Sequence, residues 1–290
     1  MTSLPSPLNT KMNIKRLALC SLFVVAFSIA ALAQSVRTTT KTDKFDLSSG
    51  ATLTVTGAPN GSIKIVGSPK NEIEIIATIG IEAANDADFA KLAAITGFVT
   101  DESAIRVAIG SVGPHNKFGL KKLPKDFPKN LLATPFRIDY EIRVPRYTDL
   151  EIDGGKGDLS ITGVEGSMRV NFIETKGDVE VVGGTTNITV GKGTLDMAFG
   201  VRGWRGRSAT VNVGSGELNV SLPSNMHAEI EATILKTGTI ANSLVDLKPR
   251  DRKVAFTDKS ILAKAGVGGS PLKFTVGDGT MKLERLTLPL

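Results

Sequence analysis

The clearest structural pattern of the chain lies in LEIDGGKGDLSITGVEGSMRVNFIETKGDVEVVGGTTNITVGKGTLDM, residues 150–197. From it onward to Val220, pairs of apolar residues are separated by one polar residue, which is the two-residue period of a half-buried strand. Most pairs follow a glycine or a small polar turn. Strands this short and this frequent predict an all-β solenoid, a stack of coils, rather than a sandwich. The pairs are Leu150/Ile152, Leu159/Ile161, Met168/Val170, Val179/Val181, Ile188/Val190, Leu195/Met197, Val211/Val213 and Leu218/Val220.

The pattern extends to both sides of this stretch. Ahead of it, apolar pairs recur every ten residues, so we expect the stack to start near residue 50, after a flexible leading segment at 35–43. Behind it, Ile230 and Ile240 continue the rungs, and the last strands are expected to form the closing coil. The early pairs are Leu53/Val55, Ile63/Ile65 and Ile73/Ile75, and the closing pairs are Leu272/Phe274 and Met281/Leu283.

Residues 85–96 interrupt the strands with a helical pattern. Asn85 or Asp86 can cap a helix, Leu92 lies on its apolar face, and Gly97 ends it. We expect one short helix here, covering the first coils. A second interruption, the basic run at 246–254, is expected to form a connection.

Two Lys-Gly-Asp triplets, twenty residues apart, end in Asp158 and Asp178. If these residues occupy equivalent positions in successive coils, their carboxylates stack roughly 5 Å apart. Paired carboxylates at that distance serve glycosidases and calcium sites. The alternative is turn chemistry neutralised by Lys156 and Lys176, and we favour it because the third repeat has Thr194 in place of an acid.

The first 33 residues have the features of a secretory signal peptide. Lys11, Lys15 and Arg16 precede an apolar region at 17–31, and Ala31-Leu32-Ala33 forms a cleavage site before Gln34. The apolar region is shorter than a membrane-spanning helix needs. We therefore expect a signal peptide at 1–33 and one β-solenoid domain at 34–290. The protein would be exported to the periplasm, the cell surface or the extracellular space, and would not span a membrane.

Composition excludes several classes of function. The formal charge of +6 falls to +3 once the three leader cations are removed, which argues against a nucleic-acid partner. The only cysteine, Cys20, lies in the leader, so no disulfide is expected. The two histidines, His115 and His227, are far apart, so neither a zinc site nor another cofactor is expected. Serine nucleophile motifs are absent, and we expect no enzyme.

Three segments carry a family resemblance: GSIKIVG at 61–67, EIRVPRYTDLEIDGGKGDLSITGVEGSMRV at 141–170, and SPLKFTVGDGTMKLER at 270–285. They are similar to bacterial exported adhesin-like domains of unknown function, of the auto-transporter adhesin head (GIN-like) type. The resemblance implies a right-handed parallel β-helix and a location in the cell envelope. It implies no catalytic residues.

Two loops depart from the plain repeat and are the candidate binding sites. The step between Leu195 and Val211 is longer than the usual nine residues, so the segment 199–208 is expected to protrude. An exposed Trp surrounded by Arg suits sugars, anionic headgroups and protein partners. In the alternative reading, the ring folds back to fill a gap in the stack. The residues concerned are Trp204, Arg202, Arg205 and Arg207.

The second loop, at 111–135, is long and rich in proline and lysine. Lys121, Lys122 and Lys125 would attract anionic envelope polymers, or the loop is simply solvated and covers one side of the stack.

Taken together, these features favour a non-enzymatic envelope β-solenoid with an adhesin-like or scaffolding role. Its partner would be an envelope polymer, a glycan or a surface protein. Two alternatives stay open: a polysaccharide-active β-helix enzyme that uses Asp158 and Asp178, and a periplasmic assembly or sensor protein.

Overall fold

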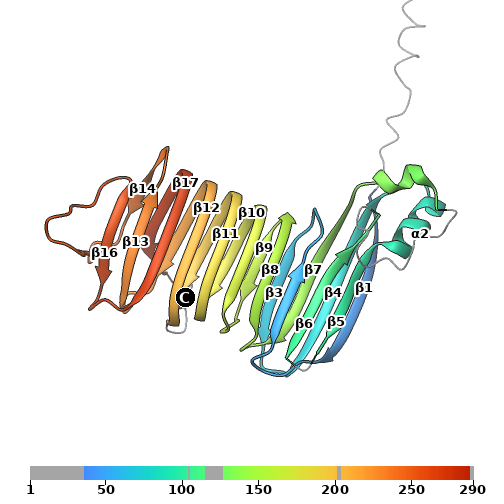
Figure 1. Ribbon diagram of the computed structural model, residues 1–290, viewed down its shortest axis with the longest axis horizontal. Coiled ribbons are helices and arrows are strands. Elements are labelled where there is room, and N and C mark those ends of the chain that lie inside the picture. Colours follow the sequence, from blue (N-terminus) through green and yellow to red (C-terminus); the bar gives the residue numbers. More distant parts are fainter. Residues whose placement is uncertain (1–35, 104, 115–126, 201–203, 288–290) are drawn as a thin grey trace, which may run out of the picture. The chain divides into compact units, whose positions relative to one another are not determined.

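The computed structural model describes residues 36–103, 105–114, 127–200 and 204–287. They belong to one compact unit, Val36–Leu290, built almost wholly of strands (Figure 1). The elements are β1 (Val36–Asp46), β2 (Thr52–Thr56), β3 (Ile63–Ser68), β4 (Glu72–Glu82), α2 (Asp86–Ile95), β5 (Gly97–Glu102), β6 (Arg106–Val112), η1 (Lys129–Ala133), β7 (Phe136–Pro145), β8 (Asp149–Lys156), β9 (Leu159–Thr162), β10 (Met168–Val181), β11 (Gly183–Phe199), β12 (Arg205–Leu222), β13 (Ala228–Ile234), β14 (Gly238–Asn242), β15 (Lys248–Pro249), β16 (Ser260–Ala265) and β17 (Ser270–Arg285).

The strands form two facing layers, which we call sheet I and sheet II. Sheet I follows the order β5-β6-β2-β8-β10-β11-β12-β17-β13-β16-β15. Sheet II follows the order β1-β4-β7-β3-β9-β10-β11-β12-β17-β14. The long strands β10, β11, β12 and β17 bend, so that their first halves lie in sheet I and their second halves in sheet II. The strands of each sheet lie side by side along the stack (Figure 1).

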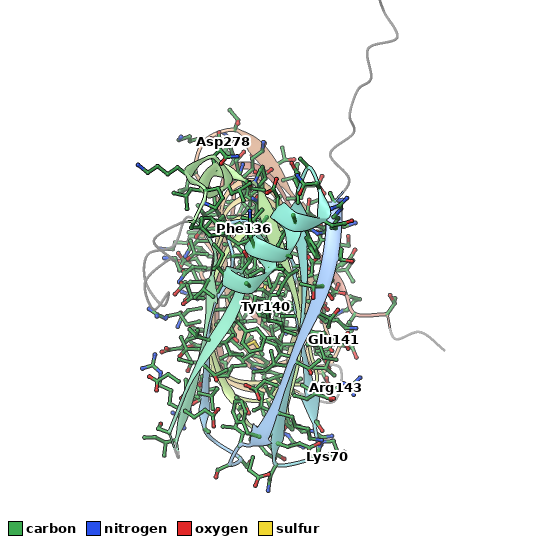
Figure 2. All side chains as sticks on the ribbon, turned by 90° about the vertical axis from the view of Figure 1, so that its right-hand side faces the viewer. Lys70, Phe136, Tyr140, Glu141, Arg143 and Asp278 are labelled. Carbon is green, nitrogen blue, oxygen red and sulfur yellow. The ribbon has the colours of Figure 1, made fainter. Side chains whose placement is uncertain are left out.

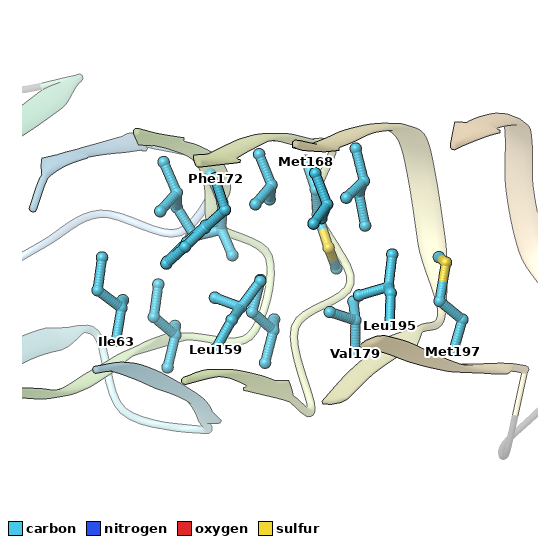
Figure 3. Packing of buried hydrophobic residues seen from close by; sticks show 14 of the residues in the cluster. Ile63, Leu159, Met168, Phe172, Val179, Leu195 and Met197 are labelled. Atoms are coloured by element: carbon cyan, nitrogen blue, oxygen red, sulfur yellow. The ribbon is translucent and has the colours of Figure 1, made fainter. Parts of the chain in front are cut away.

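The core is a set of aliphatic ladders between the two sheets. In sheet I, Val170 pairs with Ile188, which pairs with Val211. Val179 and Met197 are in register in sheet II. All the apolar pairs predicted between Leu150 and Val220 are buried, so the prediction of a β-solenoid and of its inward faces is confirmed. Figure 3 shows part of this core, including Met168, Val179 and Met197, between the two layers.

Glycines with a left-handed backbone form the bend between the two halves of each long strand. Gly193, Gly216 and Gly279 have φ of 133°, 132° and 142°. A Cβ on any of them would lie 1.8 Å from the carbonyl oxygen of the residue stacked below it, Thr175, Gly193 and Gly216 respectively. The bend therefore requires glycine twice over, for its φ and for the close approach of the neighbouring coil.

The repeat length differs from the sequence expectation. Asn171 donates to Asp153, eighteen residues earlier, and the two are in register. Asp178 lies beside Ser160 and Asp196, so Asp158 and Asp178 do not stack and the expectation that they occupy equivalent positions is wrong. A shift of two residues keeps every side chain on the same face, which is why the hydrophobic pattern could not detect the error.

The stack is mixed, and its order departs from the chain order at both ends. β1 pairs antiparallel with β4, so the sheets begin at Val36 rather than near residue 50. β17 is not the closing coil, because it lies between β12 on one side and β13 and β14 on the other. Insertion of the last strand between earlier ones satisfies both of its backbone edges.

The predicted helix is confirmed as α2. The side chain of Asn85 accepts a hydrogen bond from the backbone N–H of Asp88, and Leu92 is fully buried. At the same end of the stack, the Lys41 ammonium points inward and donates to the Thr96 carbonyl oxygen at 2.7 Å. An inward charge and a nearby helix protect the edge strand β1 from pairing with other chains.

Candidate functional site

Six uncharged polar residues cover the outer surface of sheet I in its middle, and we call this surface the Asn–Thr face. One row crosses β10, β11, β12 and β17, which are adjacent strands in Figure 1, and the other crosses β11 and β12. Within a row, neighbours stand one strand spacing apart, about 4.8 Å. One row contains Asn171, Thr189, Asn212 and Thr275, and the other contains Asn187 and Thr210.

The alternation of each strand aims these side chains outward. Val170, Ile188 and Val190 are buried on the inner side, so the residues between and beside them must face solvent. Asn171 donates to Asp153 at 2.8 Å. Within the described part of the chain, the other five side chains of the Asn–Thr face have no hydrogen-bond partner. The face thus presents free donors and acceptors on a rigid sheet.

Charged residues border the Asn–Thr face without entering it. At the β17 side, Lys273 is bound by Glu231 at 3.1 Å. At the β8 side, Glu151 accepts from Thr54 at 3.2 Å and pairs with Arg106 at 3.6 Å. A shallow hollow of about 200 Å³ lies at this border, and Arg169 lines it.

The outer surface of sheet II is more acidic. Asp178 and Asp196 are in register there, and Asn219 donates to Asp196 at 2.7 Å. The described ranges contain no group of three or more His, Cys, Asp or Glu residues that could hold a metal ion. From the sequence, a stacked carboxylate pair is considered for Asp158 and Asp178. The register instead places Asp178 beside Asp196.

Both ends of the Trp204 segment belong to the sheets, and residues 201–203 between them lie outside the described residues. Phe199 is fully buried at the end of β11, and Arg205 already belongs to β12. The Trp204 ring packs against Phe199, with centroids 5.2 Å apart, and a side chain on Gly206 would collide with it. The ring is half-buried and its Nε1 has no hydrogen-bond partner among the described residues. These contacts favour the alternative in which Trp204 fills the stack.

The arginines of this segment have different environments. Arg205 pairs with Glu165 at 3.7 Å, and Arg146 pairs with the same carboxylate at 3.6 Å. Arg207 is exposed at a bulge where β12 shifts its register against β11. Arg202 and the lysines of the other loop, Lys121, Lys122 and Lys125, lie outside the described residues.

The phenol of Tyr140 lies inside the stack. Burial raises the pKa of Tyr140 to about 12, although its hydrogen bond with Ser111, at 2.8 Å, acts in the opposite direction. Figure 2, which looks at the β1 end, shows Tyr140 between the two sheets. Its position in the core makes it a structural group and not part of an open site.

Sequence reasoning missed the Asn–Thr face. Its signal is the recurrence of Asn-x-Thr at 187–189 and Thr-x-Asn at 210–212 on the polar side of consecutive rungs. These residues are common on strand surfaces, and only the register shows that they form continuous rows.

Comparison with solved structures gives distant similarities. A putative cell adhesion protein from Clostridium sporogenes shares 13% identity with a TM-score of 0.40, covering 86% of this chain and 100% of that chain. A putative adhesin from Bacteroides fragilis shares 12% with a TM-score of 0.31, covering 86% and 97%. A putative lipid binding protein from Parabacteroides distasonis shares 12% with a TM-score of 0.24, covering 86% and 97%. Comparison with curated proteins finds no match.

The family comparison is decisive. Residues 103–284, more than half of the chain, match the Toastrack DUF4097 family. This match agrees with the β-solenoid fold. It does not support the auto-transporter adhesin head (GIN-like) type that the sequence resemblance implied. The chain belongs to the Toastrack DUF4097 family.

Proposed function

We propose that the chain is an exported, non-enzymatic binding protein of the bacterial envelope, with an adhesin-like or scaffolding role, and that the Asn–Thr face binds an envelope glycan. The observation that carries the proposal is the double row of outward amide and hydroxyl groups, five of which have no partner in the described part of the chain. Polar groups with unused hydrogen-bonding capacity on a rigid strand surface need no reordering before they bind.

The chemistry of the Asn–Thr face suits a polymer with many hydroxyl groups. Amides and hydroxyls both donate and accept, as sugar hydroxyls do. Each hydrogen bond in water contributes only about 0.5–1.5 kcal/mol, so useful affinity requires several contacts in parallel. A repeating polymer laid across β10, β11, β12 and β17 would supply them.

The chain offers a matched pair of variants to test this site. Thr189→Val with Thr275→Val removes two hydroxyls from the Asn–Thr face while keeping the shape and strand propensity of the side chains. Thr194→Val with Thr280→Val makes the same change on the same two strands, β11 and β17, in sheet II. We expect the first pair to weaken binding to purified envelope polysaccharide about tenfold and the second to leave it unchanged. Equal affinities for the two variants would refute the site.

The basic residues near the two loops are proposed as an auxiliary attraction for anionic groups. Arg207 is exposed, and Arg205 lies beside it in β12. Neutralising both should flatten the dependence of envelope binding on salt, because attraction between exposed charges is screened by ions. The same role is proposed for Arg202, Lys121, Lys122 and Lys125.

Export is proposed from the leader. Mass spectrometry of the mature protein should find Gln34 at the N-terminus. A protein that retains Lys15 in the cell would contradict export. In the described ranges, no helix is long and apolar enough to cross a membrane.

The non-enzymatic assignment is supported by the surroundings of the carboxylates. Asp158 and Asp178 are not neighbours, and the pair that is in register, Asp178 and Asp196, lies on an outer strand surface where Asn219 donates a hydrogen bond to Asp196 at 2.7 Å. Purified protein should therefore release no reducing ends from the polysaccharide that it binds.

A further inference from the structure

The edge of sheet I at β15 carries a pair of like charges. Lys248 of β15 and Lys264 of β16 are directly opposite each other in an antiparallel ladder. Like charges in this arrangement are destabilising, so the pair contributes nothing to the fold. Lys248 is exposed and Lys264 is half-buried, and a feature that opposes folding at an edge invites a functional explanation.

The carboxylate directly opposite Lys264 is already bound by an arginine. Glu229 is the cross-strand neighbour of Lys264 on its other side, but Arg250 binds that carboxylate at 3.3 Å. Neither Lys248 nor Lys264 forms an ion pair among the described residues. The chain continues with two more exposed cations, Arg252 and Lys253.

Two exposed valines lie on the same side of the lysine pair along the β15–β16 ladder. Val245 precedes Lys248 by three residues and is 100% exposed, and Val267 follows Lys264 by three residues and is 85% exposed. Because β15 and β16 are antiparallel, going backward from Lys248 and going forward from Lys264 lead toward the same end of the ladder. The backbone N–H of Val267 donates to His227 Nδ1 at 3.2 Å, which holds the turn that presents this valine. We call Val245, Lys248, Lys264 and Val267 the Lys–Val edge.

We propose that the Lys–Val edge docks on an anionic phospholipid surface. Cations at such a surface gain attraction from the negative headgroups, and apolar side chains beside them can enter the boundary between headgroups and acyl chains. The exposed side chains of Val245 and Val267 have no role in the core and would otherwise lie in water. An acidic polysaccharide would use the lysines but would have no use for the valines.

This docking is independent of the glycan proposal. The Asn–Thr face lies on β10, β11, β12 and β17, whereas the Lys–Val edge lies beyond β13, on and beside β16 and β15. The two surfaces can therefore be inactivated separately. A protein held on a membrane by this edge would keep the Asn–Thr face available to a polymer.

Co-sedimentation of the mature chain with vesicles tests the proposal. Vesicles of phosphatidylcholine alone are compared with vesicles that also contain phosphatidylglycerol, at low and high salt. The wild type should bind only the anionic vesicles, and more weakly at high salt. Lys248→Gln with Lys264→Gln should reduce binding about thirtyfold, since each cation near the surface contributes separately. Val245→Ser with Val267→Ser should reduce it severalfold without changing the salt dependence.

Lys176→Gln with Lys192→Gln is the matched control, because both lysines are exposed in the described structure and neither has an ion-pair partner there. It should bind vesicles as the wild type does. The Lys248/Lys264 variant should melt at the same or a higher temperature, because it removes a repulsion. The proposal is overturned if anionic vesicles are not bound, if the two lysine variants lose binding equally, or if the Lys–Val edge retains soluble acidic polysaccharide but not vesicles.

Discussion

Replacing Gly216 by alanine should destabilise the stack far more than replacing a glycine outside the bends, such as Gly50 or Gly110. Gly216 has φ of 132°, a conformation that costs alanine about 1–3 kcal/mol. In addition, the new Cβ would lie 1.8 Å from the carbonyl oxygen of Gly193, where ordinary contact begins at 3.4 Å. The obstacle is backbone and cannot rotate away, so the two coils must separate locally.

Separation breaks ladder hydrogen bonds on both sides of the bend, because Gly216 is itself stacked between Gly193 and Gly279. Leaving buried backbone groups unpaired costs about 1–3 kcal/mol each. With the conformational cost, we expect Gly216→Ala to lower the free energy of unfolding by about 3–6 kcal/mol.

Two other glycines distinguish the cost of the backbone conformation from the cost of the steric clash. Gly50 has φ of 84° with nothing within 4 Å of a Cβ, so Gly50→Ala should cost only the conformational part, about 1–2 kcal/mol. Gly110 lies within β6, and its Cβ would contact Val99 at an ordinary 3.6 Å. Gly110→Ala should therefore be neutral or stabilise by about 0.5–1 kcal/mol. Urea denaturation of the three variants measures the series. If Gly216→Ala costs no more than Gly50→Ala, the close stacking at the bend is wrong.

Three further changes test the core and the Trp204 segment. Val181→Asp should cost several kcal/mol in a urea titration because it buries an unpaired charge, whereas the exposed Asp178→Lys should cost under about 0.5 kcal/mol. Because the pKa of Tyr140 is raised to about 12, the unfolded chain ionises first as pH rises; stability is therefore complete below pH of about 10 and lost between about 10 and 12. Tyr140→Phe should remove that loss, with the exposed Tyr147→Phe as control, and an unchanged alkaline transition in Tyr140→Phe would contradict the assignment. Trp204→Ala should lower the thermal midpoint, since the ring packs on the core, and a midpoint equal to that of the wild type would restore the reading of Trp204 as a free binding residue.

Local patterns predicted the strands and their faces because alternation is a property of each strand alone. Val170, Ile188 and Val211 could be assigned to the core without knowing which strand lies beside which. Similarly, the α2 cap at Asn85 is a matter of a few neighbouring residues.

Register could not be predicted in the same way, because a slip of two residues leaves every face unchanged. The sequence count aligned Gly157 with Gly177, but Gly177 lies within β10. Because Glu174 pairs with Lys156, the bend position next to Gly157 is occupied by Thr175. The order of the last strands, with β17 between β12 and β13, is a long-range property that no local pattern contains.

The candidate site also depended on register, which the sequence does not show. The sequence prediction named rare residues such as Trp204, whose ring packs against the buried Phe199. The Asn–Thr face consists of common residues, and its continuity depends wholly on the register of β10, β11 and β12. The Asn–Thr face could therefore be recognised only once the structure gave the pairing of these strands.

Hydrogen–deuterium exchange of the mature protein, with and without purified envelope polysaccharide, shows whether the Asn–Thr face binds the polymer. Ligand over the Asn–Thr face should slow exchange in the first halves of β10, β11 and β12, at residues 169–171, 187–189 and 210–212. The second halves of the same strands, in sheet II, provide the internal control and should not change. Protection confined to sheet II or to the Trp204 segment, or no protection at a saturating polymer concentration, would contradict the account.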